Sequence, residues 1–434
     1  MIKNIYETKS INKLILTFSL PAILSLIIEI MTSIVDTIFA GFLGEQSITA
    51  LTAMGIISPI LSIYIAFQTL YANSTAILVA HNLNKKNIRN EYLIVGILST
   101  LTLTLIISIV SFIIIDKILY LLGAKEYIFI FAKKYLKIQL FSNIFSSLGY
   151  ILTNCIRAFG YPKIEFIFIT LSVIINIIFN FILVFIFDIG FIGLALGTLI
   201  SEIFCMTISI IWLINKKLFP KFYKIELKTF YSKSSELFLI GFAQTIIQIL
   251  SSCTGFFINK NLIYYTDVTY IGIWNIVQKI YTLLLMPIIG ITQSIQTILS
   301  YYNGNNQEYK KQKTIKTTII YTIIYGIIIS ILIFSINNKF NNFLYSETLV
   351  ILKIVFSTFS VIGIFYTILT LFEVTGYEKK AVILIIIRQI FLLLPLIYLV
   401  PTIFPNFKYA IFLSIPISDI IILIITLILK NKKV

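Results

Sequence analysis

The sequence predicts an all-α protein that crosses a membrane many times. Three features lead to this prediction: high hydrophobicity, low charge and the length of the apolar segments. Of its 434 residues, 59% are hydrophobic and 12% are charged, and the mean hydropathy is +0.99. Soluble proteins carry roughly 25% charged residues. Half that share leaves too little polar surface to cover a globule in water, so we expect lipid to be the remaining solvent.

The apolar residues occur in long continuous runs. Such runs indicate helices, because the strands of membrane barrels show short alternating patterns instead. A helix needs about 20 mainly apolar residues to cross a bilayer. Twelve segments meet this requirement, at residues 14–38, 48–78, 92–115, 128–156, 164–187, 190–213, 236–262, 268–300, 317–336, 348–376, 381–401 and 408–429. The sequence therefore predicts a polytopic membrane protein with twelve transmembrane helices.

The basic residues are unevenly distributed between the two sides of the predicted membrane. Most of the 34 lysines and arginines, Arg157 among them, fall in loops on the side of the N-terminus. Cytoplasmic loops carry such an excess, so we expect both termini in the cytoplasm of a bacterial or archaeal cell, with the chain in its inner membrane. Anionic lipid accounts for the net charge of +16, and no nucleic acid is expected as a partner.

A polar segment divides the predicted spans six and six. Residues 214–235 contain a proline and six lysines, a composition typical of an interfacial cytoplasmic linker. We therefore expect an N-lobe at residues 1–213, a linker at 214–235 and a C-lobe at 236–434.

The two halves share short motifs at the same topological place. Ile-Leu-Thr at 151–153 precedes Gly-Tyr-Pro-Lys at 160–163, and Ile-Leu-Thr at 368–370 precedes Gly-Tyr-Glu-Lys at 376–379. Chance similarity between Ile-rich helices is the alternative explanation. A parallel repeat predicts two six-helix bundles related by a pseudo-two-fold axis, the arrangement that a rocking transporter with a midline cavity requires.

Two acids in the first span are the leading candidates for function, because carboxylates inside a membrane are costly and rare. Glu29 and Asp36 are seven residues apart, about two turns or roughly 10 Å along a helix, and so share a face. Burial favours the neutral form of a carboxylate, and alternation between the two forms is what proton coupling needs. The alternative for Asp36 is an acid at a helix end that caps backbone groups or meets water.

The fifth and sixth spans offer uncharged polar groups. Asn176 and Asn180 are four residues apart and share a helix face, and Thr198 follows the glycines of GFIGLALG. Carbonyl and hydroxyl oxygens near a carboxylate suit a hard cation such as Na⁺. Hydrogen bonding between helices in an Asn-rich chain is the alternative interpretation.

Other chemistry finds little support in the sequence. There is no Gly-x-x-x-x-Gly-Lys-Ser/Thr loop, His81 is the single histidine, and no clustered His, Asp or Ser set suggests an enzyme or a cofactor. The three cysteines lie in predicted spans, where small buried side chains are the default interpretation. Lys260, Lys279, Glu373, Arg388 and Asp419 lie in or near the spans of the second half, and side chains that reach the interface from helix ends explain most of them.

Several ordered motifs resemble those of the multidrug and toxic compound extrusion (MATE) transporters over nearly the whole chain. They are PAILSLIIEIMTSIVDTIFAGFLG (21–44), CIRAFGYPK (155–163), Asn176, GFIGLALGTLISE (190–202), MPIIGITQSIQ (286–296) and YYNGN (301–305). The resemblance implies an N-lobe and a C-lobe of six helices each, a central cavity, and export of drugs in exchange for H⁺ or Na⁺.

The resemblance also implies that Asp36, Asn176, Asn180 and Thr198 form a cation or proton site in the N-lobe. The branch of the family with this site commonly has a second aspartate where this chain has Asn180. A Na⁺ site with one carboxylate loses charge, so we expect proton coupling through Asp36, assisted by Glu29.

The leading hypothesis is therefore a monomeric antiporter that extrudes cationic or amphipathic organic compounds by alternating access. We expect Gln278, Lys279 and Gln293 to line the substrate cavity. The alternative is a flippase for lipid-linked sugar precursors, which related folds of the superfamily perform. Such proteins tend to have cationic cavities and often additional spans.

Overall fold

The computed structural model describes residues 5–124, 126–220, 225–265, 269–336 and 343–431. Within these ranges the regular secondary structure is entirely helical, and the predicted all-α class is confirmed. The helices of the first half are α1 (Ile5–Thr8), α2 (Ile11–Gly41), the short 3₁₀ helix η1 (Gly44–Gln46), α3 (Ser47–His81), α4 (Lys86–Ile113), α5 (Ile115–Leu121), α6 (Glu126–Ala158), α7 (Pro162–Phe181), the π-helical η2 (Ile182–Ile186) and α8 (Phe191–Asn215).

The second half has the same character. Its helices are α9 (Leu227–Tyr265), α10 (Thr269–Gly304), α11 (Glu308–Ser335), α12 (Phe343–Phe356), α13 (Phe359–Val374), α14 (Glu378–Ile386), the π-helical η3 (Ile387–Leu393), α15 (Leu394–Ile403) and α16 (Ala410–Asn431).

Each predicted span coincides with one helix or with consecutive helical pieces. In the described part of the chain, nine helices are long and apolar enough to cross a membrane, and α12 with α13, bent by 45°, makes a tenth. The two remaining predicted spans, 128–156 and 236–262, lie in α6 and α9, which are 33 and 39 residues long. In the described part of the chain, ten of the twelve predicted spans therefore lie in helices long and apolar enough to cross a membrane.

The chain folds into two compact units. The first comprises residues 1–8 and 24–245, and the second comprises residues 9–23 and 246–434. Helices α2 and α9 are each divided between the two units, after Ile23 and after Thr245. The sequence prediction placed the boundary earlier, in a linker at 214–235.

Polar contacts explain why the end of that segment belongs to the first unit. Helix α9 already begins at Leu227, inside the predicted linker. Lys233 forms an ion pair with Glu91 of α4, and Tyr92 donates a hydrogen bond to Glu236 at 2.7 Å. The polar residues that suggested an exposed linker therefore hold the start of α9 against α4.

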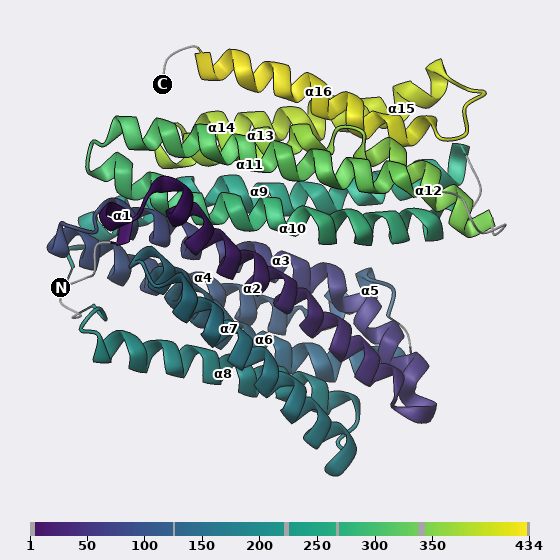
Figure 1. Cartoon of the computed structure of the whole chain (residues 1–434). Coiled ribbons are helices and arrows are strands. Elements are labelled where there is room, and N and C mark those ends of the chain that lie inside the picture. The colour runs from purple at the N-terminus through teal and green to yellow at the C-terminus, as the bar shows by residue number, and fades with distance from the viewer. Residues whose placement is uncertain (1–4, 125, 221–224, 266–268, 337–342, 432–434) are drawn as a thin grey trace. The chain divides into compact units, whose positions relative to one another are not determined.

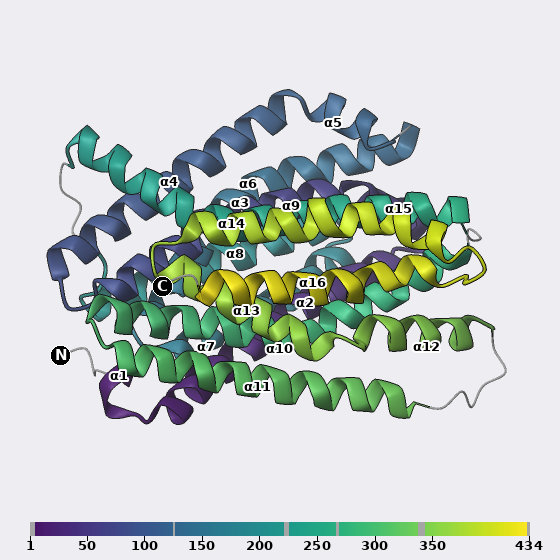
Figure 2. The same ribbon diagram turned by 90° about the horizontal axis from the view of Figure 1, so that it is seen from above.

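Long helices pack alongside one another within each unit. In the first unit, α6, α7 and α8 run side by side, with extensive contacts of α6 to α3 and α8 (Figure 1). In the second unit, α13 lies between α11 and α16 in both views (Figures 1 and 2). Glycine permits the closest of these approaches: a Cβ atom added to Gly326 of α11 would lie 2.5 Å from the Cα atom of Ser360 in α13.

The substitution Gly326→Ala is expected to destabilise the second unit. The new methyl group would meet backbone, which cannot turn aside as a flexible side chain can, and such overpacking costs about 1–3 kcal/mol. Gly55→Ala in α3 is the matched control, because an added Cβ has nothing within 4 Å. Thermal unfolding of the purified variants should show a lower midpoint for Gly326→Ala alone, and equal midpoints would contradict the packing described here.

Candidate functional site

Asp36 lies in α2 and is buried in the first unit, with 8% of its surface exposed. Asn180 of α7 donates a hydrogen bond from Nδ2 to the Asp36 carboxylate, with 2.6 Å between Nδ2 and Oδ1. Asn180 is fully buried. The partner of this buried acid is thus a neutral amide.

A chain of hydrogen bonds continues from Asn180 to α8. Asn180 Nδ2 also donates to Asn176 Oδ1 at 3.1 Å, and Asn176 Nδ2 donates to the Thr198 hydroxyl at 3.3 Å. Thr198 in turn donates to the backbone carbonyl of Leu194 at 3.0 Å. The structure therefore joins Asp36, Asn176, Asn180 and Thr198 in one network.

The close approach of α7 and α8 at this network depends on a glycine. A Cβ atom added to Gly197 would lie 2.0 Å from Asn180 Oδ1, so a larger residue would displace the amide. Asn180 Oδ1 is buried and has no hydrogen-bond partner in the protein. Both N–H bonds of this amide are used, while its oxygen remains available as an acceptor.

An aromatic side chain lies near the carboxylate. Tyr135 of α6 interacts electrostatically with Asp36, stacks on Phe191 with ring centroids 4.7 Å apart, and accepts a hydrogen bond from Gln139 at 3.2 Å. These rings belong to a buried cluster that also contains Ala40. The surroundings limit the access of water, so a change of charge at Asp36 would be felt strongly by its neighbours.

Glu29, predicted to share a face with Asp36, has other neighbours in the structure. Its side chain is exposed, and it interacts electrostatically with Glu165, Glu202 and Arg157. Glu202 is itself hydrogen-bonded to Ser146. Three carboxylates therefore gather near one guanidinium group.

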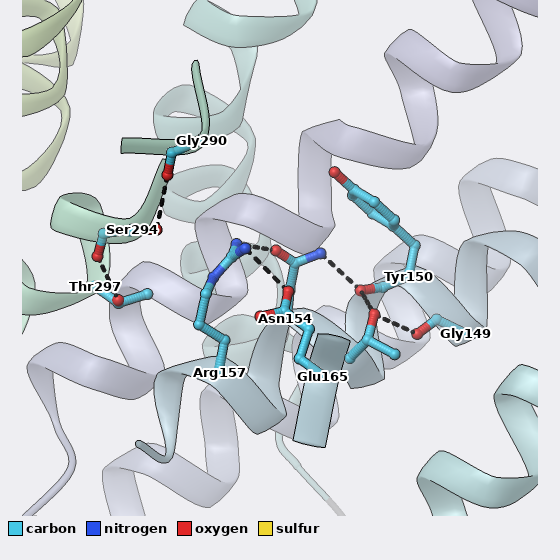
Figure 3. A network of polar contacts seen from close by, with 9 residues as sticks. Gly149, Tyr150, Asn154, Arg157, Glu165, Gly290, Ser294 and Thr297 are labelled. Carbon is cyan, nitrogen blue, oxygen red and sulfur yellow. Dashed lines mark hydrogen bonds and ion pairs between the residues drawn. The ribbon is translucent and has the colours of Figure 1, made fainter. Parts of the chain in front are cut away.

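Arg157 is the centre of a buried polar network (Figure 3). Its Nη1 donates to Glu165 Oε1 at 2.9 Å, its Nη2 donates to Asn154 Oδ1, and Asn154 Nδ2 donates to the Tyr150 carbonyl at 2.8 Å. Arg157 and Glu165 are 4% and 3% exposed. Arg157 was expected in a loop, but it lies in the last turn of α6, where the ion pair with Glu165 of α7 allows its charge to be buried.

A local signal in the sequence could have revealed this pair. Arg157 lies in the last turn of α6 and Glu165 in the first turn of α7. Between them, Gly160 has a φ of 92°, which glycine adopts without strain, and Pro162 begins α7. Opposite charges on either side of a tight turn between helices are well placed to meet.

The second unit contains a cavity of about 190 Å³. Gln278, predicted to face substrate, lines it, whereas Lys279 and Gln293 are not among its lining residues. Lys279 is exposed and Gln293 is half-buried. Of the three residues expected to form one substrate site, only Gln278 borders this space.

The other charged residues of the second half are mostly paired and buried. Arg388 Nε and Nη2 donate to Asp419 Oδ1 at 3.1 and 2.9 Å, and Gln296 donates to Glu373 at 2.8 Å. Side chains that reach the interface were the favoured explanation of these charges, and for these residues that explanation was wrong. The side chain of Lys260 lies outside the described residues.

Comparisons with known proteins found a matching family model, similar sequences and similar folds. The MatE family model matches residues 21–182. The multidrug export protein MepA of Staphylococcus saprophyticus is 23% identical over 92% of this chain and 89% of its own length. The multidrug export protein MepA of Staphylococcus haemolyticus is 28% identical over 73% of this chain and 69% of its own length.

Solved structures share the fold. A MATE crystal structure in the bent conformation has a TM-score of 0.90 at 16% identity and covers 99% of this chain and 96% of its own. The outward-facing conformation of a multidrug resistance MATE family transporter has a TM-score of 0.87 at 18% identity, with 100% and 99% covered. Both likenesses concern the fold.

Glu165→Gln is expected to destabilise the first unit strongly. It leaves the Arg157 charge buried without a carboxylate, a change that costs about 3–5 kcal/mol in proteins. Asp116→Asn is the control, because the Asp116 side chain is 52% exposed in its ion pair with Lys133, and exposed pairs contribute about 1 kcal/mol or less. Melting curves with equal midpoints for the two variants would contradict a buried pair.

Proposed function

This chain belongs to the MATE family of transporters, and we propose that it exports small organic compounds across the membrane in exchange for protons. The observation that carries the proposal is the buried Asp36 carboxylate, whose hydrogen-bonding partner is the neutral amide of Asn180. A carboxylate without a cationic partner inside lipid is a functional candidate by default, because its charge is not compensated.

Two states of Asp36 would couple proton binding to conformation. The ionised carboxylate accepts the N–H of Asn180, as the observed geometry allows. A protonated carboxyl could instead donate to Asn180 Oδ1, which has no partner in the protein, if the amide turned over. That turn would also change the hydrogen bond between Asn180 and Asn176. The effect of proton binding at Asp36 in α2 would therefore reach α7 and α8.

Sodium is the alternative coupling ion. Na⁺ binds oxygen atoms, and Asp36, Asn176 and Thr198 could supply them. The network, however, holds a single carboxylate to balance the charge of a bound cation. A proton neutralises that one carboxylate without further ligands, so the network favours a proton.

Organic cations and amphipathic compounds are the proposed cargo. The relatives named MepA are multidrug export proteins. In this chain three carboxyl groups, those of Glu29, Glu165 and Glu202, lie near the single guanidinium group of Arg157, a composition that suits cations better than pyrophosphate. A flippase for lipid-linked sugar precursors is disfavoured for that reason. We further propose that the chain acts as a monomer in the cytoplasmic membrane with both termini in the cytoplasm.

Replacement of Asp36 by Asn should abolish export. The amide has nearly the same shape as the carboxylate but cannot take up and release a proton, so the exchange cycle stops. A drug-sensitive host that expresses the variant should accumulate a cationic dye such as ethidium as fast as cells without the protein.

Asp116→Asn serves as the control for expression and folding and should export normally, because Asp116 is an exposed acid far along the sequence from the network. Export by Asp36→Asn at the rate of the unmodified protein would remove Asp36 from the coupling role.

A further inference from the structure

We propose that the cavity of the second unit is a binding subsite for aromatic compounds that carry a carboxylate. The claim that the ligand is a transported substrate rests on the proposed export function. Binding at the cavity does not, because it can be measured without transport. The basis of the proposal is the set of hydrogen-bond donors and rings that border the cavity, described below.

Arg388 presents the positive end of its ion pair to the cavity. It is the one charged side chain among the described lining residues, and its partner Asp419 is not part of the lining. Both carboxylate oxygens of Asp419 already accept hydrogen bonds. Oδ1 accepts from Arg388 Nε and Nη2, and Oδ2 accepts from the Thr358 hydroxyl at 3.3 Å. The cavity is therefore bordered by a guanidinium group whose carboxylate partner is not among the lining residues.

A second donor at the cavity lacks a partner. Trp274 lines the cavity and is 5% exposed, and its buried Nε1–H has no hydrogen-bond acceptor in the protein. A buried donor without an acceptor costs about 1–3 kcal/mol, so such groups need an explanation. A ligand oxygen would remove that cost.

Aromatic rings form the walls of the same space. Tyr281 and Tyr366 line the cavity with Trp274. Tyr281 is held by Phe356 and Phe359, with ring centroids 5.5 and 5.6 Å away, and Trp274 packs on Phe412 at 5.4 Å. Rigid rings around a few polar groups are typical of small-molecule sites. A volume of about 190 Å³ is enough for one substituted ring and its acidic group.

The backbone at Arg388 is also unusual. Arg388 and Gln389 both line the cavity and both lie in the π-helical segment η3. Such segments interrupt α-helices rarely and occur often at functional sites. The interruption of the helix coincides with the residues that would recognise the ligand.

The carboxylate is the ligand group that these features fit best. Arg388 donates from Nε and Nη2 to Asp419, and its remaining N–H bonds, on Nη1 and Nη2, match a planar carboxylate. The Trp274 N–H adds a further donor. An organic cation would instead be repelled by the positive charge of the guanidinium group. The cavity therefore extends the proposed cargo to aromatic acids and zwitterions.

The two tryptophans of the chain allow a direct test. In the variant Trp212→Phe, Trp274 is the only tryptophan, and its fluorescence reports occupancy of the cavity. The purified variant is titrated with para-nitrobenzoate, with its methyl ester and with (para-nitrobenzyl)trimethylammonium. These probes share a quenching ring and differ in charge. Saturable quenching by the carboxylate, about tenfold or more tighter than by the ester or the cation, is expected.

Substitutions in the Trp212→Phe background identify the donors. Arg388→Gln should weaken carboxylate binding at least tenfold, and Asp419→Asn should strengthen it, because a competing negative charge is removed. If either variant melts early, Gln278→Leu, at an exposed lining position, is expected to weaken binding severalfold without unfolding the protein.

Equal quenching by the three probes, preference for the cation, or the absence of saturation would overturn the proposal. So would quenching of the same strength in Trp274→Phe, where Trp212 alone reports and packs against Tyr161 in the first unit. Normal ethidium export together with any of these results would refute the subsite and leave the proposed function standing.

Discussion

Lipid offers no hydrogen bonds, so a buried carboxylate in this protein needs to find a partner within the chain. Asp419 does so through Arg388 and Thr358, and Glu165 does so through Arg157. Asp36 has the amide of Asn180 as its partner. An ion pair fixes the charge of both members, whereas an acid beside a neutral amide retains the freedom to exchange its charge for a proton. Glu373, whose partner is the amide of Gln296, shares this freedom with Asp36. The amide beside Asp36 continues into a network that joins α2, α7 and α8.

Helix packing places these partners beside one another. The side chains of Asn176 and Asn180 meet α2 and α8 because Gly197 lets α8 approach the amide closely. In the second unit, Gly326 gives α11 the same kind of close contact with α13. Apolar side chains gain little by leaving lipid for the protein interior, so the hydrophobic effect does not drive helix association here. Small residues allow the close packing that does.

Much of the fold could be predicted from the sequence, because the lengths of apolar runs report directly on membrane spans. The Asp36 network could also be anticipated. The spacing places Asn176 and Asn180 on one helix face, and the resemblance to the MATE family implied that they join Asp36 and Thr198. Two features could not be anticipated. The Arg388–Asp419 pair depends on which helices become neighbours, and hydropathy does not carry that information. The boundary between the units could not be predicted either. The first unit extends to Thr245 because polar residues at the start of α9 bind α4, and in the sequence these residues resemble a linker.

The most direct test of the account is the ion that drives substrate movement in proteoliposomes. With ethidium as substrate, a pH gradient at constant Na⁺ should drive transport by the unmodified protein, and a Na⁺ gradient at constant pH should not. Asn180→Asp, which adds a second carboxylate beside Asp36, is expected to acquire a response to Na⁺. Transport by the unmodified protein under a Na⁺ gradient alone, with no response to pH, would contradict proton exchange at Asp36.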